Sequence, residues 1–199
     1  MRFPHHTRMS VTRRGDKELR LGAFIARGLD GIAALAKEAA LPPARCAMLV
    51  IARSGQSPVV KTIANVASEI AATGCSVRII LVKPDRFGMP DALSATQAAG
   101  LDCELRSARN PRLIEAHEQL TIGARTSWTG DTMRRDPSIC DAYESFVEDC
   151  PEIAVAAAAT FERLWADCER LADGAALAAD VPTRRPKQIL PASLPVRRT

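Results

Sequence analysis

Aromatic side chains are scarce in this sequence, at 4% of 199 residues, with two tryptophans and one tyrosine. Few rings are therefore present to stack on nucleic-acid bases. Long hydrophobic runs are missing too, because no apolar stretch approaches the roughly 20 residues of a membrane-spanning helix. The sequence predicts neither a transmembrane segment nor an aromatic nucleic-acid platform.

Motifs for metals and nucleotides are also absent. The six cysteines form no CxxC pair, which excludes a zinc ribbon and a thioredoxin motif. The Ser54–Ser57 turn lacks the glycines of the GxGxxG and GxxxxGK[ST] patterns, and the acids at 136–149 have no metal-loop spacing. We expect no metal and no cofactor.

The cysteines and the N-terminus indicate a compartment. Several cysteines stand in apolar runs, where a thiol behaves as a small hydrophobic group, so we expect reduced thiols. Arg13-Arg14 is followed by polar residues instead of an apolar segment, so we expect no secretory or twin-arginine signal. Both features predict a cytoplasmic protein.

Charge is unevenly distributed. Of the net charge of +4, residues 1–20 contribute +4 and residues 181–199 contribute +5, so residues 21–180 carry −5. Basic ends can contact polyanions weakly by counterion release, or can simply be solvated. A broad basic DNA-binding face on the folded part is not expected.

The length and the 47% hydrophobic content indicate one globular domain. We expect a flexible basic tail at 1–16, an α/β domain at 17–173 and a disordered basic tail at 174–199.

Apolar periodicity predicts the elements of that domain. Helices are expected at 17–40, 59–73, 91–99 and 151–171, and strands at 46–52, 77–82, 101–105, 117–122, 125–129 and 142–147. A tight turn is expected at Gly123-Ala124 and a polar loop at 130–139. The order predicts an α/β fold, a mixed sheet sandwiched by helices.

His117 is the only histidine outside the N-terminal tail. Gly130 and Asp131 open the predicted polar loop that contains Arg134 and Arg135. A backbone turn and two guanidinium groups are suited to hold an anion. Two alternatives stay open, a structural strand histidine and a solvated Arg-Arg-Asp-Pro turn.

One group of motifs resembles a half-domain of the phospholipase D superfamily over residues 30–170. The matching residues are His117-x-Gln119, the following hairpin, Ser127-Trp128-Thr129-Gly130-Asp131, Glu144 and Phe161-x-x-Leu164-Trp165. The family pattern is H-x-K-x4-D, then G-S-x-N, then an Asn-x-Glu-like strand and a helix ending F-x-x-x-W. The resemblance implies a phospholipase D-like α/β half-domain.

The polar positions of that motif are largely altered. Gln119 stands at the lysine position, Ala124 at the aspartate, Asp131 at the serine and Met133 at the asparagine. By resemblance, a histidine attacks phosphorus to give a phosphohistidine and a second histidine acts as the acid, so two half-domains must pair. One positioned donor is worth roughly 3 kcal/mol, so these changes should remove several kcal/mol of transition-state stabilisation.

Three hypotheses result, and they leave open whether the chain is an enzyme. The first is a catalytically degenerate phospholipase D-like domain that acts as a homodimeric binding or scaffold module. The alternative is an active phosphodiesterase or phosphotransferase on a lipid or nucleic-acid phosphodiester. In it His117 is the nucleophile with Gln119 and Asp131, and Gly130, Arg134 and Arg135 bind phosphate. The third is an unrelated α/β protein with a structural His117.

Overall fold

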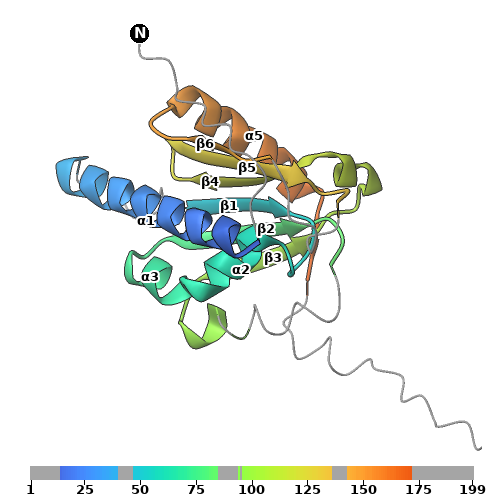
Figure 1. The fold of residues 1–199 in the computed structure, drawn as a ribbon, viewed down its shortest axis with the longest axis horizontal. Helices are drawn as coiled ribbons and strands as arrows, with labels where there is room; N and C mark the ends of the chain where they lie inside the picture. The colour runs from blue at the N-terminus through green and yellow to red at the C-terminus, as the bar shows by residue number, and fades with distance from the viewer. Residues whose placement is uncertain (1–13, 40–46, 85–93, 95, 136–142, 172–199) are drawn as a thin grey trace, which may run out of the picture.

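The computed structural model describes residues 14–39, 47–84, 94, 96–135 and 143–171 (Figure 1). Its helices are α1 (Arg14–Ala39), α2 (Pro58–Asn65), α3 (Ala67–Ala72) and α5 (Pro151–Ala166), with a 3-10 turn, η2, at Pro111–Glu115. Its strands are β1 (Ala47–Ala52), β2 (Ser76–Leu81), β3 (Cys103–Ser107), β4 (His117–Ile122), β5 (Thr126–Thr132), β6 (Ser145–Val147) and β7 (Glu169–Arg170). Within the described residues, no helix is both long and apolar enough to cross a membrane.

The strands form one mixed sheet in the order β6-β5-β4-β1-β2-β3-β7. β1, β2 and β3 run parallel, whereas β4, β5, β6 and β7 each pair antiparallel with a neighbour. The parallel pair β1–β2 is joined through α2 and α3, as a βαβ unit requires. The predicted mixed α/β sheet is confirmed.

Helices cover both faces of the sheet (Figure 1). On one face, Phe24 of α1 and Ile63 of α2 pack with Leu120 and Trp128 of the sheet. On the other, Phe161 and Trp165 of α5 pack with Leu49, Ile51 and Ile80. β1 contributes side chains to both cores, which explains its unbroken apolar run.

Several predicted boundaries are wrong. The expected helix over 59–73 is divided at Val66, whose backbone leaves the helical region. The strand expected at 101–105 is β3, two residues further on, and the strand expected at 142–147 is reduced to the three residues of β6. Periodicity identifies a buried run better than its ends, because strand partners decide where the pairing stops.

Two further corrections bear on the site. The polar loop expected from Gly130 is wrong at its start, because Gly130, Asp131 and Thr132 belong to β5, and Thr132 still pairs with His117 of β4. The last helix ends at Ala166 instead of 171, and the chain then turns into β7 beside β3. In both places, pairing with a neighbouring strand overrides the local pattern.

Other predictions fall partly or wholly outside the described residues. These are most of both tails, the end of the polar loop at 130–139 and much of the helix at 91–99. The tight turn between β4 and β5 is present, and Gly123 has a positive φ of 57° there, which glycine adopts without steric cost.

Candidate functional site

His117 is the first residue of β4. Because β4 runs antiparallel to β1, with Gln119 opposite Ile51, this histidine lies at the carboxyl end of β1. In open α/β sheets, that edge is where ligands bind. The half-buried ring has its Nδ1 2.7 Å from the carbonyl oxygen of Gly130 and its centroid 5.1 Å from that of Tyr143.

The Gly130 carbonyl determines which nitrogen of His117 carries the proton. A carbonyl oxygen can only accept, so in the neutral ring Nδ1 donates and Nε2 keeps its lone pair. The imidazole is thereby oriented by the main chain of β5. This is the arrangement that a nucleophilic or general-base nitrogen needs.

A bulge in β5 brings Gly130 to that position. His117 pairs with Thr132 and Gln119 with Thr129, so two β5 residues, Gly130 and Asp131, face one residue of β4. Glycine is required here because a Cβ at position 130 would lie 2.3 Å from Cη2 of the buried Trp128.

Asp131 makes a buried ion pair with Lys17, which lies 114 positions earlier in the sequence. Its Oδ2 lies 2.7 Å from Nζ of Lys17 on α1, and the two side chains are 15% and 7% exposed. Its Oδ1 accepts the main-chain N–H of Tyr143 at 3.3 Å. The carboxylate thus ties α1, β5 and the approach to β6 together beside His117.

Glu118 is the residue that sequence reasoning missed. It is 5% exposed, and it accepts hydrogen bonds from the Ser57 hydroxyl and, at 3.3 Å, from the Arg53 main-chain N–H. Burial raises the pKa of Glu118, although both hydrogen bonds and the charge of Lys17 oppose this. Glu118 stands two residues before Leu120 and four before Ile122, so all three side chains point to the same buried face of β4. This period of two is the sequence signal that indicates the burial of Glu118.

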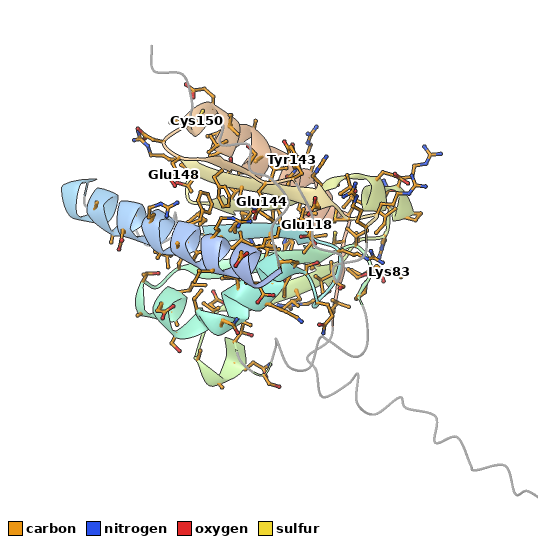
Figure 2. All side chains as sticks on the ribbon, in the orientation of Figure 1. Lys83, Glu118, Tyr143, Glu144, Glu148 and Cys150 are labelled. Carbon is orange, nitrogen blue, oxygen red and sulfur yellow. The ribbon has the colours of Figure 1, made fainter. Side chains whose placement is uncertain are left out.

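A second buried carboxylate, Glu144, stands just before β6. The guanidinium of Arg20 on α1 pairs with its Oε2, while Oε1 is buried with no hydrogen-bond partner. Figure 2 labels Glu118, Tyr143 and Glu144. The N-terminal part of α1 therefore supplies one cation each to Asp131 and Glu144.

The remaining predicted residues lie around this centre. Gln119 is half-buried, and among the described residues no hydrogen bond joins it to His117 or Asp131. Arg134 and Arg135 are exposed beyond the end of β5; Arg134 pairs with Glu115 at 3.3 Å. The geometry brings together His117, Gly130 and Asp131.

The other two altered motif positions are Ala124, which is distant from His117, and Met133, which is buried in the core. Ala124 lies in the β4–β5 turn at the opposite end of β4, and Met133 is buried against α5. A cavity of about 380 Å³ also opens at the turn end, between α1 and the turn, lined by Gly31, Ile32 and Ala124 among others. His117 does not line that cavity.

Metal binding finds no support in the part of the chain that the structure describes. No three His, Cys, Asp or Glu side chains there are arranged to hold an ion. The described cysteines are free thiols at positions 75, 103, 150 and 168. Burial, and to a smaller degree Asp102, raises the pKa of Cys103 to about 12, which makes this thiol unreactive at neutral pH.

Comparison with known proteins gives a fold likeness only. No protein-family model matches the chain, and no curated protein matches it. Among solved structures it is similar to Nuc, a phospholipase D family member from Salmonella typhimurium, with 15% identity and a TM-score of 0.47 over 64% of this chain and 82% of that one. It is also similar to TrmBL2, an archaeal chromatin protein whose structure shows a novel mode of DNA binding. That match has 14% identity and a TM-score of 0.43 over 64% of this chain and 45% of that one. Both TM-scores lie below 0.5, so neither likeness decides family or function.

Proposed function

We propose that this chain is a phospholipase D-like half-domain that has lost hydrolysis and acts as a homodimeric binding or scaffold module. One observation carries the proposal. Asp131, which stands where the resembled family has a serine, is committed to a buried ion pair with Lys17 beside His117. A carboxylate in this position replaces the hydroxyl that would contact a phosphoryl oxygen.

The charge around His117 also opposes phosphoryl transfer. Asp131 lies in the bulge beside His117, and Lys17 is already paired with it. A phosphodiester brings a negative charge, which a neighbouring carboxylate repels. Gln119 retains an amide donor but supplies no cation to stabilise charge that develops in the transition state.

A bound anion would then be held beside this centre by exposed groups. Arg134 and Arg135 come shortly after the end of β5, and both are exposed to solvent. We assign them, with the main chain of the bulge at Gly130, to contact an anionic ligand without reaction. Guanidinium groups suit this role because each offers several donors in a fixed plane.

Hydrolysis of bis(4-nitrophenyl) phosphate in the presence of EDTA tests the loss of activity. We expect no turnover by the wild-type chain or by His117→Ala. A surface variant, Lys61→Ala, purified in parallel, controls for contaminating nucleases. Turnover by the wild type and Lys61→Ala that disappears in His117→Ala would overturn the proposal.

The homodimer is tested separately. Tyr143 is 46% exposed and its ring lies against that of His117, so this face offers an aromatic anchor for a second copy. Sedimentation equilibrium should give a mass of about twice 21.4 kDa, shifted toward the monomer by Tyr143→Ser. A monomer at every concentration would contradict this part of the proposal.

A second candidate function is an active phosphodiesterase with His117 as the nucleophile. The observation that favours it is the Gly130 carbonyl, which orients the ring and leaves Nε2 with its lone pair. Attack by Nε2 on phosphorus would expel one ester oxygen and leave an Nε2–phosphorus bond, which water then hydrolyses. The same assay distinguishes the two functions, since only this one requires turnover dependent on His117.

A further inference from the structure

Basic residues gather at the edge of the sheet where β1, β2 and β3 end. They come from four separate loops, after β1, β2, β3 and β5. We call them the carboxyl-edge row; its members are Arg53, Lys83, Arg109, Arg112, Arg134 and Arg135. Figure 2 shows Lys83 at the end of the sheet toward which β1 and β2 point.

Hydrogen bonds connect these loops into a continuous row. The guanidinium of Arg53 donates to the carbonyl oxygens of Arg134 and Arg135, and the N–H of Lys83 donates to the carbonyl of Arg53 at 2.7 Å. On the far side, the N–H of Ala108 donates to Leu81 at 2.9 Å, which places Arg109 next along the edge. The order in space is therefore β5, β1, β2, β3.

The row keeps a net positive charge. Arg134 pairs with Glu115 and Arg109 pairs with Glu169, which leaves the charges of other members of the row. Arg53 is bonded to carbonyl oxygens, which do not neutralise its charge. Within the described part of the chain, the side chains of Lys83 and Arg112 have no recorded hydrogen bond or ion pair.

We propose that the carboxyl-edge row binds the phosphate backbone of a nucleic acid. The proposal rests on the binding role proposed above and names its partner. From β5 to β3 the row crosses five adjacent strands, or about 19 Å at roughly 4.8 Å per strand. Over that length one strand of a duplex presents about five phosphates, so a linear row of cations matches a linear series of anions.

An anionic membrane fits less well because it also needs exposed aliphatic side chains to insert. Of the described residues, the large exposed aliphatic ones are Leu19 on α1 and Ile153 and Val155 on α5, on helices that cover opposite faces of the sheet.

The experiment measures binding of the full chain to a fluorescein-labelled 20-nucleotide oligothymidylate and to a 20-base-pair duplex, by anisotropy at several salt concentrations. The test variant is Lys83→Glu/Arg112→Glu, which reverses the two unpaired charges. Its matched control is Arg27→Glu/Arg125→Glu, with the same change in net charge at the opposite end of the sheet. Circular dichroism checks that each variant is folded.

We expect wild-type binding that weakens with salt, and at least a tenfold loss in the Lys83/Arg112 variant. Removing each phosphate contact should lower the salt slope by roughly 1. The control should stay within about twofold of the wild type.

Three results would overturn the inference. They are no oligonucleotide binding, an equal loss in the test and control variants, and tighter binding to phosphatidylserine vesicles or polyglutamate than to either oligonucleotide. None of these results bears on hydrolysis, so the proposal of a non-hydrolytic binding module would still stand. Conversely, turnover that depends on His117 would refute the non-hydrolytic module but would not contradict nucleic-acid binding by the carboxyl-edge row.

Discussion

The two ends of β4 hold similar chemical groups in opposite surroundings. At the His117 end, Lys17 pairs with Asp131 where the side chains are 7% and 15% exposed. At the turn end, Arg27 pairs with Glu148 where they are 55% and 49% exposed, on the rim of the cavity. Figure 2 labels Glu148 at that end. Burial decides how much each ion pair contributes to the free energy of unfolding. Water screens the exposed Arg27–Glu148 pair but is largely excluded from the Lys17–Asp131 pair.

The ends differ in their charge balance too. The turn-end arginines are each matched by an acid, Arg27 by Glu148 and Arg125 by Asp149. The His117 end combines buried carboxylates with a surplus of cations at the surface. A segment that is acidic in total can therefore still present a basic edge, because the fold separates charges that the sequence mixes.

Removing the buried cation should have the largest effect. Lys17→Met leaves Asp131 buried without its partner, which costs about 3–5 kcal/mol of the free energy of unfolding. Urea denaturation measures this value. The double variant Lys17→Met/Asp131→Leu should regain most of it, and a loss below about 1 kcal/mol in the single variant would contradict the buried pair.

A methyl group at the bulge should have the next largest effect. Gly130→Ala places a Cβ against Trp128, and overpacking of this kind costs about 1–3 kcal/mol. The matched control is Gly31→Ala on α1, where a Cβ meets nothing within 4 Å. That helix position should gain about 0.5–1 kcal/mol by thermal unfolding. Equal changes at both sites would argue against the bulge.

Neutralising Glu118 should change how stability depends on pH. Because burial raises its pKa, the folded state holds the proton more tightly than the unfolded state. The stability that protonated Glu118 contributes to the folded state is full below the pKa of the unfolded state, near 4.5, and is lost as pH rises through the pKa of the folded state. As pH rises from 4.5 to 8, Glu118→Gln should therefore gain stability relative to the wild type. Urea denaturation at a series of pH values measures this difference in the free energy of unfolding. A constant difference across that range would count against a raised pKa.

Breaking the exposed pair should have the smallest effect. Arg27→Ala should change the free energy of unfolding by less than about 1 kcal/mol, and 1 M salt should reduce the change further. A loss as large as that of Lys17→Met would remove the contrast between the two ends.

Sequence patterns anticipated much of the fold and part of the site. Short apolar runs predicted β1 and β2, and His117, Gly130 and Asp131 were predicted as neighbours and lie together. Glu118 was missed because a charged residue in a strand is usually solvated, and its burial depends on α1 and the loop after β1.

Local sequence patterns predict which segments are buried and where Gly123 turns the chain. Local pattern suffices for these because each depends on residues a few positions apart. Only the tertiary structure decided that Lys17 neutralises Asp131, that the chain after α5 returns as β7 and that four loops align their cations along one edge. Such contacts join residues up to 114 positions apart, and pairing between strands, which no local periodicity encodes, brings them together.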